Sequence, residues 1–276
     1  MNCQRQPPNQ QTIMLTKAYS LISYRLDSLD GGIGKVKDFY FDDQFWAIRY
    51  LVVDTGEWLP GRQVLLAPHA VSRVNNATDL ITVGLTKKQI EDGPSLADHK
   101  PVSRQFEDDY YCHYGWAPYW VGALSGESSY PNSSRESDNG VRAMQAENRA
   151  DRHLRSTHEV SKYSIHAKDG EIGHVEDFII DDDTWRIRYL EVCTNNWWAG
   201  KKVLISPQWI ERISVSNSEV FLSLSREEIK QSPEYTDEAL LNRDYEDRLY
   251  KHYHRPGYWL KELMTKGSVV LNETVF

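Results

Sequence analysis

The sequence GKVKDFYFDDQFWAIRYLVVD at residues 34–54 recurs as GHVEDFIIDDDTWRIRYLEVC at residues 173–193. Gly173 stands 139 residues after Gly34, and this offset aligns residues 24–120 with residues 163–259 without a gap. Of these 97 aligned positions 35 are identical, and an ungapped repeat of this extent indicates that one folding unit has been duplicated. We therefore predict two copies of one fold, each closed around its own apolar core and packed about a pseudo-twofold axis.

Each copy of this stretch predicts a β-hairpin. Residues 34–41 and 46–54 read as strands, and the acidic residues between them are typical of a turn. A symmetric turn places Asp38 opposite Arg49, and Asp177 opposite Arg188 in the second copy. Opposite charges that face each other across two strands contribute about 0.2–1 kcal/mol. We therefore predict that both copies share this Asp–Arg pair.

The rest of each copy predicts three more strands and two short helices. In the first copy the strands lie near residues 63–67, 71–74 and 80–85, and a helix covers residues 103–114. Segments of the same kind follow at the same offset in the second copy, with a helix at residues 242–253. A further short helix begins at a capping box in each copy, formed by Thr86 with Gln89 and by Ser225 with Glu228. The fold class is therefore mainly β with short helices.

Composition divides the chain into five segments. The polar, Pro-containing residues 1–14 predict a disordered N-terminus, and residues 121–157, which are rich in Ser, Asn, Gly and charge, predict a linker. The two modules occupy residues 15–120 and 158–260, and a tail covers residues 261–276.

Charge and motifs argue against several classes of function. The net charge of −8 disfavours direct contact with nucleic acid, and no run approaches the roughly 20 apolar residues of a membrane helix. Cys3, Cys112 and Cys193 form no CxxC motif, which fits a reducing cytoplasm and predicts neither a disulfide framework nor a metal site. P-loop, GxGxxG and GxSxG motifs are absent from the sequence, so we predict no cofactor and no catalytic residue.

Aromatic and histidine residues at the end of each module are the candidate binding residues. One interpretation is that they form a docking surface for a partner. A second is that His113, His252 and His254 bind a metal. The third is that the rings simply cover the open side of a small barrel. Trp58 and Trp197 recur beside a loop glycine and either cap the barrel end or contact a partner. The candidates are Trp58, Trp197, Tyr111, His113, Tyr114, Tyr119, Trp120, Tyr250, His252, Tyr253, Tyr258 and Trp259.

The acidic turns at residues 42–43 and 181–183 suggest a second kind of site. Calcium is bound by oxygen ligands, but its sites need more of them than these turns offer. Because Asp also stabilises turns by bonding its own backbone, we interpret these residues as turn formers.

The hairpin, the LTKKQI and LSREEI boxes and the closing sequences HYGWAPYW and HYHRPGYW resemble the PRC-barrel family over most of both modules. This family includes the cytoplasmic domain of the photosynthetic reaction centre H subunit and the C-terminal domain of the bacterial ribosome maturation factor. The closing sequence, present twice, is more similar to soluble bacterial members. The resemblance implies two tandem small antiparallel β-barrels with helical additions, which dock onto protein partners and share no catalytic residues or cofactor.

These observations lead to three functional hypotheses. The first is a non-catalytic, soluble, cytoplasmic adaptor that binds a protein partner through its modules, with self-association as an option. The second is a small-molecule or ion sensor with a pocket between the two barrels. The third is an enzyme, whose site would arise where the two copies differ. The absence of a predicted membrane anchor argues against a reaction-centre role.

Overall fold

The computed structural model describes residues 14–94, 102–118, 153–194, 200–236 and 241–260. The first half contains β1 (Leu15–Lys17), α1 (Ala18–Leu21), β2 (Arg25–Ser28), β3 (Gly31–Asp42), β4 (Ala47–Asp54), β5 (Gln63–Leu66), η1 (Pro68–Ala70), β6 (Val71–Asn75), β7 (Leu80–Val83), α2 (Lys87–Glu91) and α3 (Arg104–Tyr114). The second half contains β8 (Leu154–Ser156), α5 (Thr157–Val160), β9 (Ser164–Ala167), β10 (Gly170–Asp181), β11 (Arg186–Cys193), β12 (Lys202–Ile205), η4 (Pro207–Trp209), β13 (Ile210–Ser214), β14 (Glu219–Leu222), α6 (Arg226–Lys230) and α7 (Arg243–His252). Each of these elements begins 139 residues after its counterpart, and the fold is mainly β with short helices, as predicted.

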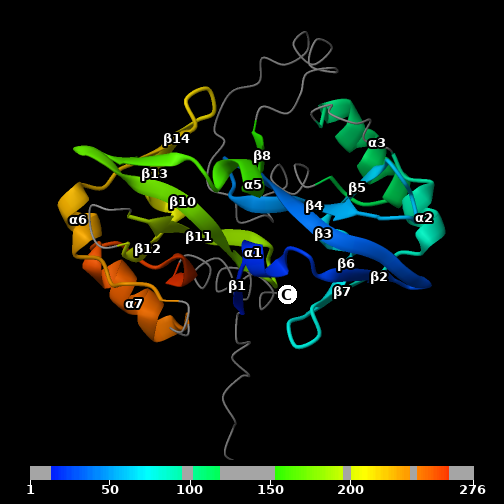
Figure 1. The fold of residues 1–276 in the computed structure, drawn as a ribbon, viewed down its shortest axis with the longest axis horizontal. Helices are drawn as coiled ribbons and strands as arrows, with labels where there is room; N and C mark the ends of the chain where they lie inside the picture. The colour runs from blue at the N-terminus through cyan, green and yellow to red at the C-terminus, as the bar shows by residue number, and fades with distance from the viewer. Residues whose placement is uncertain (1–13, 95–101, 119–152, 195–199, 237–240, 261–276) are drawn as a thin grey trace, which may run out of the picture.

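The strands of both halves belong to one sheet of 14 strands that does not close on itself. Its main path runs β13-β14-β9-β10-β11-β4-β3-β2-β7-β6, so the two halves are joined where β4 meets β11 (Figure 1). Two separate antiparallel barrels are therefore not confirmed. Each half also contains one parallel pair, β2 with β7 and β9 with β14, which the prediction of antiparallel strands missed.

The tips of the two hairpins form the junction between the halves. The backbone N–H of Ile48 donates to the carbonyl of Trp185 at 2.8 Å, and the N–H of Ile187 donates to the carbonyl of Trp46 at 2.8 Å. Both Trp residues take the left-handed backbone conformation, with φ of 53° and 55°. Exchanging the halves exchanges these two bonds, as a twofold axis between them requires.

A single apolar core extends across this junction. Phe41 and Phe178 from the two halves lie with their ring centroids 5.3 Å apart, and one cluster of buried side chains includes residues from both. The prediction that each half closes around its own core is therefore wrong for the described residues. A second, smaller cluster lies between β4, β5 and α3, where Tyr50 and Val52 pack against Tyr110. Because strand side chains alternate, β4 is buried on both faces.

The first strand of each half pairs with the other half. β1 runs antiparallel to β10, and β8 runs antiparallel to β3. The helices that follow are held in the same crossed manner: the Asp177 carboxylate accepts the backbone N–H of Tyr19 at 3.1 Å, and Asp38 accepts that of His158 at 3.2 Å. Residues 154–157, which the sequence placed in the linker, therefore form β8 and the first residue of α5.

The predicted register of the hairpin is wrong. Asp38 faces Val52, and Arg49 is the extra residue of a bulge between Ile48 and Tyr50. A second bulge follows Val36, and both bulges recur between β10 and β11. The turn itself sets a different register, because Asp42 pairs with Ala47 and a regular ladder from there would place Asp38 opposite Leu51. The bulge at Arg49 then moves Asp38 one residue further, to Val52.

Helices α2, α3, α6 and α7 lie where the sequence predicted helices, whereas α1, α5, η1 and η4 were not predicted. Both capping boxes are present, with the Thr86 and Ser225 side chains accepting the backbone N–H of Gln89 and Glu228. α3 and α7 begin after Ser103 and Asn242, whose side chains accept backbone N–H groups of the first turn. In Figure 1 these two helices lie at opposite ends of the molecule.

Candidate functional site

A buried charge network ties α3 or α7 to the hairpin in each half. Arg49 Nη1 donates to Asp42 Oδ2 at 2.9 Å, its Nη2 contacts Glu107, and the Tyr50 hydroxyl donates to Glu107 at 3.0 Å. In the second half Arg188 pairs with Asp181 at 2.6 Å, and the Tyr189 hydroxyl donates to Glu246 at 2.7 Å. The bulge that removes Arg49 from the ladder places it in this network, so sequence reasoning named Arg49 and Arg188 but gave them the wrong partner.

The two carboxylates of the second network differ in pKa. Burial raises the pKa of Asp181, but the Arg188 guanidinium and hydrogen bonds outweigh burial and the net shift is downward. Burial raises the pKa of Glu246 above its usual value, against the opposing effects of Tyr189 and Arg243. Both networks are enclosed by packed side chains, so we assign them the structural role of fixing the helices on the sheet.

Asp177 gives the crossed helix contact a pH dependence. Burial raises its pKa to about 6, despite hydrogen bonds from the backbone of Phe178 and Tyr19. The folded protein therefore binds this proton more tightly than the unfolded chain, so the stabilisation is present below about pH 4 and is lost as the pH rises through 6. Between pH 4 and 7 the Asp177 carboxyl should lower the free energy of unfolding by about 2 kcal/mol, and Asp177→Asn should abolish this fall. Urea unfolding over this pH range measures it. An unchanged slope in the variant would contradict the assignment, and Asp38→Asn, at the half-buried counterpart, is the control.

Most of the aromatic candidates that the structure describes are packing residues. Tyr111, Tyr250, Tyr253 and Tyr258 are buried, while Tyr114, Trp259 and Trp58 are partly buried. The Arg243 guanidinium covers the Trp259 ring at 4.2 Å, and Lys87 lies 5.6 Å from the centre of Trp58. Their role as a docking surface stays a prediction. The described residues do not include Tyr119, Trp120, Trp197, residues 121–152 of the linker, residues 1–13 of the N-terminal segment or the tail at residues 261–276.

The candidate histidines bond locally and do not meet. His113 Nε2 lies 3.2 Å from the carbonyl of Gln89, and His252 Nε2 lies 2.7 Å from that of Glu228. These bonds join α3 to α2 and α7 to α6, which is the local role that sequence reasoning offered as the simplest explanation. Because α3 and α7 lie at opposite ends of the molecule, His113 and His252 cannot share one metal ion (Figure 1).

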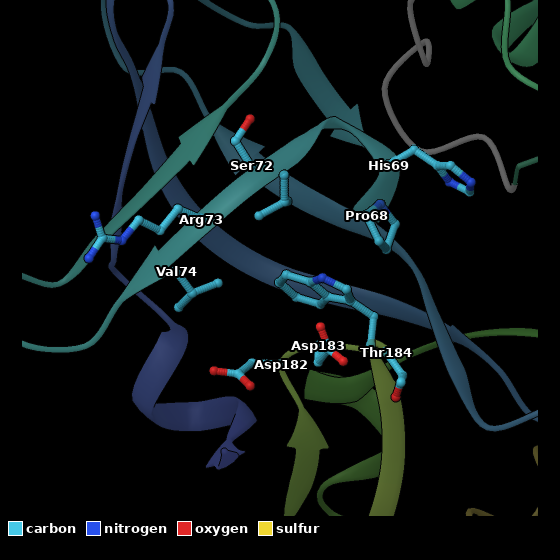
Figure 2. A pocket seen from close by; sticks show the side chains of 10 residues that line it. Pro68, His69, Ser72, Arg73, Val74, Asp182, Asp183 and Thr184 are labelled. Atoms are coloured by element: carbon cyan, nitrogen blue, oxygen red, sulfur yellow. The ribbon is translucent and has the colours of Figure 1, made fainter. Parts of the chain in front are cut away.

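A pocket of about 360 Å³ opens at the junction of the two halves. One wall comes from η1 and β6 of the first half, and the other comes from the tip of the β10–β11 hairpin of the second half. Figure 2 shows Arg73 and Val74 on one side of it and Asp182 and Asp183 on the other. The lining residues are Pro68, His69, Val71, Ser72, Arg73, Val74, Asp182, Asp183, Thr184 and Trp185.

The two acidic turns are built alike but are neutralised differently. Asp42 and Asp181 each accept two backbone N–H groups within the turn, as predicted for turn formers. The next residue of the first turn, Asp43, pairs with Arg155 at 2.8 Å and with His153 at 2.9 Å. At the same offset, the positions of these two cations hold Thr16 and Met14.

Asp182, the counterpart of Asp43, has no ion pair among the described residues. It is half-buried in the pocket wall, and burial raises its pKa, with further contributions from the charges of Asp181 and Asp183. Arg73 stands on the opposite wall without an ion pair to it among those residues. In the first half, basic residues of the same chain neutralise the equivalent carboxylate of Asp43. In the pocket, the Asp182 carboxylate has no such partner among the described residues.

Comparison with known protein families identifies one part of the chain. Residues 163–228 match the PRC-barrel domain family. The chain contains a PRC-barrel domain. The PRC-barrel match starts just before β9 and ends within α6, so it includes the β10–β11 hairpin and the acidic wall of the pocket. The repeat offset carries the same boundaries onto residues 24–89, from just before β2 into α2.

No curated protein matches this chain, so the family match is not accompanied by a named relative. Within the described residues, no helix combines the length and the apolar composition that crossing a bilayer requires.

Proposed function

We propose that this protein is a non-catalytic, soluble, cytoplasmic adaptor that binds a protein partner at the junction pocket. The partner inserts an arginine or lysine side chain between the two halves, where Asp182 and Asp183 neutralise it. The observation that carries the proposal is that Asp182 has no ion pair among the described residues, whereas its counterpart Asp43 pairs with two basic side chains.

The first half supplies a template for this contact. Arg155 and His153 belong to the segment leading into the second half, and they reach Asp43 from β8 as it pairs with β3. The same geometry at Asp182 is available to a segment supplied by another molecule. A half-buried carboxylate favours such a guest, because bringing a cation next to it offsets the cost of its desolvation.

The shape and chemistry of the pocket fit a side chain better than a free metabolite. Small-molecule sites are enclosed and mainly apolar, whereas this pocket is open and six of its ten lining residues are polar or charged. The net charge of −8 adds a longer-range attraction for a basic partner.

We further propose that each half is one PRC-type barrel module and that the pair arose by duplication. The support is the ungapped repeat, the common offset of the elements and the two bulges shared by both hairpins.

An NMR titration of the ¹⁵N-labelled protein tests the docking proposal. The probe is acetyl-Gly-Arg-Gly-amide, and the comparison peptide carries citrulline, which has the shape of arginine without its charge. We expect the arginine peptide alone to shift the backbone amides of residues 72–74 and 182–185. Equal shifts with both peptides, or none, would contradict the proposal.

Two variants locate the binding. The double change Asp182→Asn and Asp183→Asn should abolish the arginine-dependent shifts, whereas Asp43→Asn should leave them, because Asp43 already has its cations. The sensor hypothesis also places a ligand between the halves, where this pocket lies. Methylguanidinium that bound as tightly as the peptide would favour the sensor over the adaptor.

A further inference from the structure

Three potential metal ligands lie together on the surface of the second half, away from the junction pocket. They are His174 and Glu176 on β10 and Cys193 on β11. Their ligand atoms lie within 4.8 Å of one another, and the side chains of His174 and Cys193 are partly exposed while Glu176 is exposed. The charge networks and the proposed docking contact do not use these residues.

Strand register brings the three side chains together. His174 lies directly opposite Cys193 in the antiparallel pair, where Cβ atoms are about 4.5–5.5 Å apart. Glu176 is the extra residue of the bulge between Val175 and Asp177. A regular strand would hold Glu176 farther from Cys193, at the diagonal spacing of about 7–8 Å, so the bulge supplies the third ligand.

The donor set identifies the class of ion. A thiolate, an imidazole and a carboxylate are the ligands of zinc, with bonds of about 2.0–2.3 Å, whereas calcium and magnesium prefer oxygen alone. We propose that His174, Glu176 and Cys193 bind a divalent cation of the zinc class, with water in the fourth position. Binding requires the Cys193 thiol to lose its proton and the three exposed or half-buried side chains to close by about 1 Å.

The neighbouring charges accommodate this ion. Lys202 lies 3.1 Å from Glu176 and 2.8 Å from the buried carboxylate of Glu191, which also pairs with Lys17 at 2.7 Å. When Glu176 turns to the metal, Lys202 keeps its bond to Glu191. The thiolate and the two carboxylates then balance the added charge of the ion and the two lysines to within one unit.

The first half shows that the fold does not need these residues. Its matching positions hold Lys35, Lys37 and Asp54, which cannot form a zinc site together. The same backbone, with the bulge in the same place, therefore carries a ligand set in one half alone. A packing role would be expected to recur in both halves, whereas a binding role need not.

Cobalt(II) titration of the full chain tests the site. Thiolate bound to cobalt gives a charge-transfer absorption in the near ultraviolet, and zinc added afterwards should remove it. We expect one equivalent of cobalt to develop the band in the native protein. Cys193→Ser should abolish it, and His174→Ala or Glu176→Gln should weaken zinc binding about tenfold or more, since loss of even an outer partner costs about 10–100-fold.

Two controls separate this site from other thiols and from misfolding. Cys112→Ser, which changes an exposed cysteine on α3, should keep the band. Cys193→Asp installs the residue of the first half and should fold, as judged by circular dichroism, without the band. A native protein without a band, or a band that survives Cys193→Ser, would overturn the proposal.

Discussion

Arg49→Met should lower the free energy of unfolding by about 3–5 kcal/mol. Arg49 is 5% exposed and neutralises Asp42 and Glu107, so the variant leaves two buried carboxylates without a counter-charge. It also removes one of the contacts that hold α3 on the hairpin, because Glu107 is a residue of that helix. Urea unfolding followed by circular dichroism measures the effect.

An exposed ion pair provides the matched control. Lys88 and Asp92 lie 2.9 Å apart on α2 and its C-cap, with side chains 77% and 51% exposed. Lys88→Met also removes one cation from one carboxylate, but in water, where an ion pair contributes little, so the free energy of unfolding should stay close to that of the native protein. If Arg49→Met cost no more than Lys88→Met, the buried network would have no part in holding the helix.

Gly34→Ala and Gly173→Ala should each cost more than about 4 kcal/mol, the range of exceptional substitutions. A Cβ on Gly34 would lie 2.0 Å from the Asp54 carbonyl oxygen, and one on Gly173 would lie 1.9 Å from that of Cys193. Their φ angles of +135° and +153° also belong to glycine. Only a backbone shift between the paired strands could relieve these contacts, so thermal unfolding should occur at much lower temperature.

Gly61→Ala separates the clash from the backbone conformation. Gly61 has a φ of +74° but open space where a Cβ would lie. Its substitution should cost about 1–2 kcal/mol, the penalty of a left-handed residue. Similar losses for Gly61→Ala and Gly34→Ala would mean that the strands can separate without cost.

Local signals in the sequence located the elements well. The capping boxes predicted the starts of α2 and α6 because their hydrogen bonds join residues three apart. The hairpin strands were also predictable, since apolar residues flank an acidic turn. These features depend on near neighbours in the chain, which a single sequence displays directly.

Pairing between strands was harder to predict. Arg49 is the extra residue of a bulge, which no residue type in the hairpin sequence marks. β1 and β8 are three residues long, and their partners lie in the other half of the molecule. The joined core has the same origin, because Phe41 and Phe178 are buried by a contact that neither repeat contains alone.

The candidate sites depend on the differences between the repeats. Both repeats have Asp at this position, as Asp43 and Asp182, but only Asp43 pairs with Arg155 and His153. These two residues lie more than a hundred residues from Asp43 along the chain. The absence of a CxxC motif argued against a metal site at Cys193, whose position holds Asp54 in the first half. Sequence comparison of the halves could have marked His174, Glu176 and Cys193 as joint departures, but their proximity required the register.

The crossing of β1 and β8 means that neither half is complete by itself. Residues 14–118 expressed alone would expose the edge of β3 that β8 covers and would carry β1 as a loose arm. The arm of one copy matches the bare edge of another, so the fragment would form an arm-exchanged homodimer. If the pair arose by duplication, as we propose, an ancestor with a single repeat would have assembled in this way, and fusion of its two subunits into one polypeptide would have made the association permanent and independent of concentration.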